Sequence, residues 1–219
     1  MFLVVNNLIN IEKQIKSKVK DLNSNISPKI IAVSKTFKMD HIIPAIEHGH
    51  SDFGENRVQE TLEKWSSIKK IHKNIKLHLI GKLQTNKVKS AVQIFDYIHS
   101  VDSRKLAKKI ADEQNKIKKK IKIFLQVNIG EENQKSGINK DELNDLVSYC
   151  NEIELDLIGL MCIPPANADP ENYFKKMEEL NKVLGFKELS MGMSSDFLLA
   201  IKYSSTYVRI GSAIFGYRS

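Results

Sequence analysis

Short apolar runs alternate along the chain with longer segments in which apolar residues recur every three or four positions. The first pattern is typical of strands buried on both faces, and the second of helices that pack along one side. From residue 30 onward, the alternation predicts eight pairs of strand and helix. The predicted strands lie in the stretches KIIAVS, SDFGEN, LHLIG, YIHSV, IKIFLQVNI, LDLIGLMCI, ELSMGM and YVRIG.

This order of elements predicts an α/β fold, a single (β/α)8 TIM barrel with an extra N-terminal helix. The opening stretch MFLVVNNLINIEKQIKSKVKDL has the apolar spacing of an amphipathic helix. No change in composition divides the chain, so residues 1–219 are predicted to form one domain. A doubly wound open sheet is the alternative, because periodicity does not reveal whether a sheet closes.

Polar residues mark where several of the helices should begin. Asp40 is expected to cap the helix in HIIPAIEHG, and either Asp102 or Ser103 is expected to cap the helix after YIHSV. Asn139 and Glu142 have the spacing of a capping box.

The composition is that of a folded protein, with 42% hydrophobic and 27% charged residues. The formal net charge of +8 raises the alternative of an RNA-binding protein. However, the densest lysine run, Lys116–Lys122, alternates with isoleucine and lacks aromatic residues on which bases could stack. It is predicted to be a solvated helix end that leads into a strand, so no nucleic-acid partner is expected.

The two cysteines, Cys150 and Cys162, lack the spacing of a metal site, and Cys150 lies on the apolar face of a helical pattern. The histidines form no HExxH pair either, so no metal is expected. Buried, reduced thiols are predicted, as in cytoplasmic proteins. The N-terminal stretch is too interrupted by polar residues for a signal peptide or a membrane span, so a cytoplasmic location without membrane contact is expected.

In a barrel of this kind the C-terminal ends of the strands meet at one mouth, where the binding site lies. Most residues that end or follow the predicted strands are polar, although the strands themselves are apolar. The candidates for one shared site are Lys35, Asn56, Asn128, Met161, Cys162, Ser194, Arg209, Gly211 and Ser212.

Lys35 ends the apolar run IIAVSK. A surface ammonium is the usual interpretation of any single lysine. At the mouth of an apolar barrel, however, desolvation favours the neutral amine, which attacks carbonyl compounds to form an imine. Lys35 is therefore the predicted site of attachment for a carbonyl compound.

Two loops rich in glycine and serine, GMSSD and RIGSAIFG, follow the last two strands. Barrels often bind phosphate at this place through backbone N–H groups and hydroxyls. Helix capping is the alternative role for Ser194 and Ser195. Arg209 lies in an apolar stretch and so needs a fixed acceptor, either a structural carboxylate or a ligand atom.

Over nearly its whole length, the sequence resembles the pyridoxal phosphate homeostasis proteins, a family similar to the barrel domain of bacterial alanine racemases. The stretches that carry the resemblance are specific and occur in order along the chain. They are AVSKT, FGENRVQE, HLIGKLQTNK, SVDS, LQVNIGEENQKSG, GLMCIPP, LSMGMSSDFLLAI and STYVRIGSAIFG.

The resemblance implies that Lys35 forms the internal aldimine with pyridoxal 5′-phosphate (PLP), with Asn56 near the cofactor ring. It also implies that Arg209 faces the pyridine nitrogen. The residues that would hold the phosphate are Ser194, Gly211 and Ser212. Two positions depart from the family pattern: Ser204, where glycine is usual, and Leu77, where an aromatic residue is usual.

By this resemblance the protein is expected to serve intracellular PLP homeostasis, holding PLP without catalytic turnover. The alternative is a PLP-dependent, racemase-like enzyme, which would need a second base opposite Lys35. No tyrosine or histidine in the matching stretches is an evident candidate. A class I aldolase is a further alternative, but a lysine on the first strand is more similar to the racemase-like barrels. The expected partners are PLP and apo PLP-dependent enzymes, and a monomer is expected.

Overall fold

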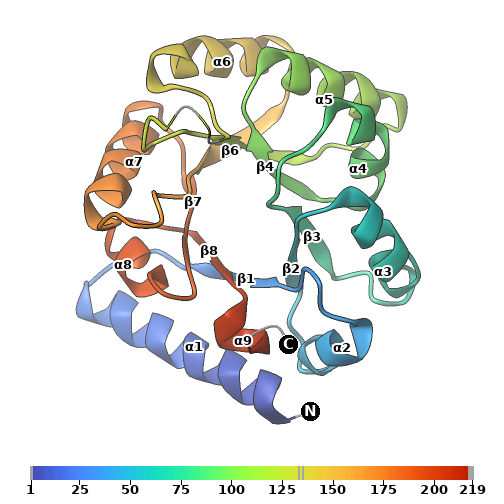
Figure 1. Ribbon diagram of the computed structural model, residues 1–219, viewed down its shortest axis with the longest axis vertical. Helices are drawn as coiled ribbons and strands as arrows, with labels where there is room; N and C mark the ends of the chain where they lie inside the picture. Colours follow the sequence, from blue (N-terminus) through green and yellow to red (C-terminus); the bar gives the residue numbers. More distant parts are fainter. Residues whose placement is uncertain (1, 133, 135, 217–219) are drawn as a thin grey trace.

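The computed structural model describes residues 2–132, 134 and 136–216, and its strands and helices alternate as the sequence predicts (Figure 1). The strands are β1 (Lys29–Val33), β2 (Asp52–Glu55), β3 (Lys76–Leu79), β4 (Tyr97–Val101), β5 (Lys122–Gln126), β6 (Asp156–Met161), β7 (Glu188–Met193) and β8 (Tyr207–Ile210). The helices are α1 (Phe2–Asp21), α2 (Met39–Glu47), α3 (Val58–Ile71), the 3-10 turn η1 (Thr85–Lys87), α4 (Val88–Ile94), α5 (Arg104–Lys116), α6 (Lys140–Glu152), α7 (Glu171–Val183), α8 (Phe197–Lys202) and α9 (Ser212–Phe215).

Within the described residues, eight strands pair in parallel and in chain order, and the pairing of β8 with β1 closes the sheet into a barrel (Figure 1). In this closing pair, Lys29 lies beside Tyr207 and Ile31 lies beside Arg209. The predicted (β/α)8 barrel with an extra N-terminal helix is therefore confirmed. The alternative of an open sheet is wrong.

Apolar side chains form two layers, one inside the barrel and one around it. Successive side chains of a strand point to opposite faces, so each strand contributes to both layers. In β1, Ile31 points inward, whereas Ile30 and Ala32 belong to the larger layer between the strands and the helices. The cluster inside the barrel consists of Ile31, Tyr97, Phe124, Met161 and Tyr207.

Helix α1 packs against α2, α8 and α9, beside the strands that close the barrel (Figure 1). It buries Val4, Leu8, Ile11 and Ile15, which recur every three or four residues along one face. The prediction of an amphipathic N-terminal helix is therefore confirmed. Among the described residues, no helix combines the length and the apolar character needed to cross a bilayer.

The starts of the helices agree with the sequence only in part. Ser103 accepts a hydrogen bond from the N–H of Leu106, so it caps α5 as predicted. The prediction for Asp40 is wrong, because α2 begins at Met39 and Asp40 lies within its first turn, where a carboxylate still favours the helix dipole. The predicted capping box is also wrong, since Asn139 precedes α6 but its side chain makes no capping hydrogen bond.

The lysine run and the cysteines lie where the sequence predicts. Helix α5 ends at Lys116 and β5 begins at Lys122, so the run joins a helix end to a strand. Cys150 and Cys162 are free thiols, and both are buried. Burial raises the pKa of the Cys150 thiol to about 11, which keeps it protonated and unreactive near neutral pH.

We expect Leu8→Ala to lower the free energy of unfolding by about 2–5 kcal/mol, because truncating a fully buried leucine leaves a cavity. Urea denaturation followed by the fluorescence of Trp65 measures this change. Leu3→Ala is the matched control on the same helix, since Leu3 is 67% exposed, and it should change stability by less than about 0.5 kcal/mol. Equal effects of the two substitutions would contradict the packing described for α1.

Candidate functional site

A cavity of about 610 Å³ opens at the C-terminal ends of the strands. Asn128 lines a neighbouring cavity of about 280 Å³, which shares Asn56 with the first. Met161 and Cys162 are fully buried, so placing their side chains at the mouth was wrong. The six residues predicted to contact the cofactor all line the larger cavity: Lys35, Asn56, Ser194, Arg209, Gly211 and Ser212.

Lys35 is half-buried in the turn that follows β1. The N–H of Phe37 donates to the carbonyl of Ser34 at 3.2 Å and closes this turn. Thr36 has a φ of 68°, in the left-handed region that β-branched residues rarely adopt. Its N–H donates to the Glu60 carboxylate of α3 at 2.7 Å. Lys35 therefore extends from a turn that is fixed by the neighbouring helix.

Arg209 is buried in β8, with 4% of its surface exposed. Its Nη1 donates to the Ser190 hydroxyl and its Nη2 to the carbonyl of Cys162, each at 2.8 Å. Burial lowers the pKa of the guanidinium, although Cys162 and Asp196 oppose this shift, and an arginine stays protonated in any case. Both of these acceptors are neutral, so the alternative of a structural carboxylate in direct contact is wrong. The two bonds leave further guanidinium donors for the cavity.

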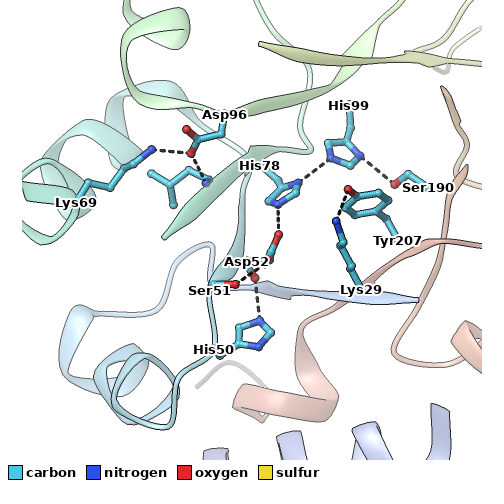
Figure 2. Close-up of polar contacts among 11 residues, drawn as sticks. Lys29, His50, Ser51, Asp52, Lys69, His78, Asp96, His99, Ser190 and Tyr207 are labelled. Carbon is cyan, nitrogen blue, oxygen red and sulfur yellow. Dashed lines mark hydrogen bonds and ion pairs between the residues drawn. The ribbon is translucent and has the colours of Figure 1, made fainter. Parts of the chain in front are cut away.

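A chain of hydrogen bonds continues from Ser190 through the inside of the barrel (Figure 2). Ser190 Oγ lies 3.0 Å from His99 Nδ1, and His99 Nε2 lies 3.0 Å from His78 Nδ1. His78 Nε2 then lies 3.0 Å from Asp52 Oδ1. Asp52 begins β2, whereas Arg209 lines the cavity at the other end of the barrel. The chain therefore connects the two ends of the barrel.

The charge states fix the direction of this chain. Burial lowers the pKa of both His78 and His99, which keeps them neutral. Burial opposes ionisation of Asp52, but its hydrogen bonds with His78 and Ser51 lower its pKa overall. An ionised Asp52 only accepts, so His78 donates from Nε2 and accepts from His99. His99 then accepts from the Ser190 hydroxyl, and every bond points from Arg209 toward the carboxylate.

Sequence reasoning missed this chain, because the histidines were considered only as metal ligands and as the second base of a racemase-like enzyme. A signal was present, since His78 and His99 each interrupt an apolar run that was predicted to be a strand. A buried histidine must find hydrogen-bond partners inside the fold. In residues 2–132, 134 and 136–216, no group of three or more His, Cys, Asp or Glu residues is arranged to hold a metal ion.

Ser194 joins the loops that follow β7 and β8. Its hydroxyl accepts from the N–H of Gly211 at 3.2 Å and from the N–H of Ala213 at 3.3 Å. The alternative of a helix cap is wrong for Ser194, because Asp196 is the residue that precedes α8. Ser212 adds a second hydroxyl to the same wall of the cavity. Hydroxyls and N–H groups together suit an oxyanion such as a phosphate.

Both departures from the family pattern are accommodated locally, and β8 keeps its pairing with β1. Ser204 has a φ of 61°, a conformation that favours glycine, and its hydroxyl donates to the Glu178 carboxylate. Leu77 is fully buried in the apolar layer around the barrel.

The chain matches known relatives over most of its length. The family model described as alanine racemase, N-terminal domain, matches residues 10–219. The pyridoxal phosphate homeostasis protein of Haemophilus influenzae is 38% identical over 228 residues, which cover 99% of this chain and 96% of the relative. The protein of the same name from Escherichia coli K12 is 36% identical, with 86% of this chain and 85% of the relative covered.

Solved structures show the same barrel. PipY of Synechococcus elongatus PCC7942, with PLP bound, is 32% identical and superposes with a TM-score of 0.81, covering 92% of this chain and 100% of that chain. The alanine racemase of Clostridium difficile 630 superposes with a TM-score of 0.71 at 16% identity, covering 100% of this chain and 57% of that chain. The second likeness concerns the fold alone.

We expect the free energy of unfolding to fall as the pH is lowered from about 7.5 to about 5.5. Burial lowers the pKa of His78 and His99 in the folded barrel, whereas both take up protons in the unfolded chain near their ordinary pKa of about 6.5. The unfolded chain then binds more protons, so stability rises with pH across this window. Each histidine that stays neutral in the folded barrel changes the free energy of unfolding by up to about 1.4 kcal/mol per pH unit.

Urea midpoints measured across this pH range test the prediction. The variant His48→Gln, which changes an exposed histidine, should show the same dependence as the native protein. A midpoint that stays constant would mean that His78 and His99 are not held neutral by the barrel.

Proposed function

Because the chain belongs to the family of pyridoxal phosphate homeostasis proteins, whose barrel is the alanine racemase N-terminal domain, we propose that it binds PLP and serves intracellular PLP homeostasis. The observation that carries this proposal is the single cavity that brings together Lys35, Arg209 and the serine loops. The related PipY, solved with PLP bound, supports it.

The residues around the cavity fit a small phosphorylated aldehyde. PLP supplies an aldehyde that condenses reversibly with a primary amine, and Lys35 supplies that amine. Asn56 lines the same cavity and would lie beside the ring. In this proposal Ser194, Gly211 and Ser212 hold the phosphate. The Ser194 hydroxyl, which accepts from the Gly211 N–H, would donate its own proton to a phosphate oxygen, as would the Ser212 hydroxyl.

Arg209 faces the pyridine nitrogen in this proposal. A guanidinium only donates, so the ring nitrogen accepts and stays unprotonated. The Ser190 hydroxyl and the Cys162 carbonyl accept from the guanidinium and hold it in place. An unprotonated ring is a weaker electron sink, which disfavours bond breaking in an attached amino acid. The site is therefore suited to holding the cofactor.

A racemase-like enzyme also needs groups that exchange protons with its substrate from opposite sides. Among the described residues that line the cavity, Lys35 and Arg209 are the ionisable ones. Arg209 stays protonated, so Lys35 alone suits the role of a base. We therefore favour a protein that holds PLP and passes it to apo enzymes over a racemase-like enzyme, and we expect it to act as a cytoplasmic monomer.

We expect Lys35→Ala to abolish covalent attachment of PLP, because the amine that meets the aldehyde is lost while the phosphate donors remain. Borohydride reduction followed by peptide mass spectrometry should find PLP on Lys35 of the native protein and on no lysine of the variant. Lys38→Ala removes a neighbouring exposed lysine and should be labelled like the native protein. Retained labelling of Lys35→Ala would show that another lysine holds the cofactor.

At saturating PLP, we expect the native protein to racemise L-alanine far more slowly than a typical enzyme, for which turnover is around 10 per second. The reasons are the donating Arg209 and the lack of a second base among the described lining residues. Chiral chromatography measures the rate, and an apo PLP-dependent enzyme added to the same tube should slowly gain activity. A turnover of the enzymatic order would favour the racemase-like alternative.

A further inference from the structure

We propose that Lys64 is the positioning residue for Lys35: it holds both ends of the turn that carries Lys35 and so aims that amine into the cavity. The inference rests on the proposed function, because it concerns the amine that the cofactor meets. Lys64 lies in α3, behind the turn, and its side chain is 9% exposed.

The ammonium of Lys64 contacts four oxygen atoms. Two are backbone carbonyls at the ends of the turn, that of Ser34 at 2.9 Å and that of Phe37 at 3.3 Å. The other two are carboxylate oxygens, one of Glu55 at 2.8 Å and one of Glu60 at 3.1 Å. An ammonium has three N–H donors, which match its hydrogen bonds to Ser34, Phe37 and Glu60, and the contact with Glu55 is an ion pair.

Glu55 anchors this cation inside the fold. It is fully buried at the end of β2, and its Oε1 accepts from the Ser34 hydroxyl at 2.8 Å and from the Trp65 indole at 2.9 Å. Its Oε2 has no hydrogen-bond partner among the described residues. A buried carboxylate that loses its cation is strongly destabilising. Lys64 is therefore held at the turn by the charge beneath it.

The turn needs such support because of Thr36. Its φ of 68° is strained for a β-branched residue, and strain of this kind persists only where the surroundings enforce it. The N–H of Thr36 donates to Glu60, which also contacts Lys64. Burial opposes ionisation of Glu60, but the Thr36 N–H and the Lys64 ammonium lower its pKa overall, so the carboxylate stays charged. The strained turn beside Lys35 is therefore held by two charged side chains, Glu60 and Lys64.

A purely structural role for Lys64 makes a different prediction. A network that only anchors α3 to the barrel would, on removal, weaken every part of the site alike. A network that aims Lys35 would, on removal, impair covalent attachment more than it impairs phosphate binding. The phosphate donors lie on the loops after β7 and β8, whereas the turn follows β1.

Two probes on the full chain separate these roles. PLP captured by borohydride reports attachment to Lys35, and 4′-deoxypyridoxine 5′-phosphate, which lacks the aldehyde, reports noncovalent binding alone. We expect Lys64→Met to raise the PLP concentration needed for half-maximal capture by about tenfold or more. This is the size of effect known for hydrogen bonds to charged groups. The affinity for 4′-deoxypyridoxine 5′-phosphate should change by less than about twofold.

The matched control is Lys69→Met on the same helix. Lys69 pairs with Asp96 at 2.6 Å (Figure 2). It also donates to the carbonyl of Ile94, and neither of these partners belongs to the Lys35 turn. It therefore forms an ion pair on the same helix, less buried than that of Lys64 and Glu55, that leaves the Lys35 turn untouched. We expect this variant to bind both probes like the native protein.

A second variant guards against misfolding, because Lys64→Met leaves the Glu55 carboxylate without its cation. In the double variant Glu55→Gln with Lys64→Met, the amide oxygen still accepts from Ser34 and Trp65, and no buried charge is left unpaired. The fold should recover while the turn stays unsupported. Capture of PLP should therefore stay impaired in the double variant.

Native-like capture of PLP by Lys64→Met or by the double variant would overturn the proposal. If the double variant lost PLP capture and affinity for 4′-deoxypyridoxine 5′-phosphate equally, the proposal would also be overturned. Failure of both variants to fold would have the same meaning. Either result would show that the network serves the fold and does not aim Lys35. If the native protein itself captures no PLP at Lys35, the proposed function fails as well, and the native sample alone distinguishes that failure.

Discussion

The hydrogen bonds between β8 and β1 are the interaction on which the site depends. They place Ala32 beside Ile210, so the residues that follow the first and the last strand reach the same edge of the barrel. Lys35 and Gly211 therefore line one cavity although they lie far apart in the sequence. Parallel pairing adds a second constraint, because it brings every strand to the mouth by its C-terminal end. An open sheet would separate the amine from the loops after β7 and β8.

The inside of the barrel holds apolar side chains and also the chain of hydrogen bonds that runs from Arg209 to Asp52. The apolar rings and the hydrogen-bonded groups stabilise one another. The cation and the carboxylate at the two ends would be costly to bury alone. The neutral rings between them are held by stacking, His99 on Phe124 with ring centroids 4.2 Å apart and His78 on Tyr97 with ring centroids 4.1 Å apart. In such a low-dielectric interior, aligned hydrogen bonds strengthen one another. The barrel thus presents Arg209 to the cavity without a carboxylate that would compete for its donors.

The strands and the residues of the mouth were predictable from the sequence because they follow local rules. Apolar runs mark strands, and polar residues at the ends of parallel strands must meet. The partners of Arg209 were not predictable, because they depend on the register of β7 against β8, which shifts between Ser190 and Met193. Such irregularities leave no mark in apolar periodicity. Lys64 was missed for a related reason, since a lysine on a helix is usually exposed and only the fold shows the carboxylates beneath it.

In the proposed function the protein must hold PLP firmly and still release it, and two separate attachments serve both needs. The loops after β7 and β8 would hold the phosphate, and the turn after β1 carries the amine. While one attachment persists, the other re-forms at a high effective concentration, so the cofactor leaves only when both are broken together. How readily the covalent attachment re-forms depends on how well the amine is aimed, and therefore on the rigidity of the strained turn at Thr36. If Lys64 positions Lys35 as proposed, the charges of α3 and β2 that support this turn set retention, and the buried pair of Lys64 and Glu55 determines release as well as structure.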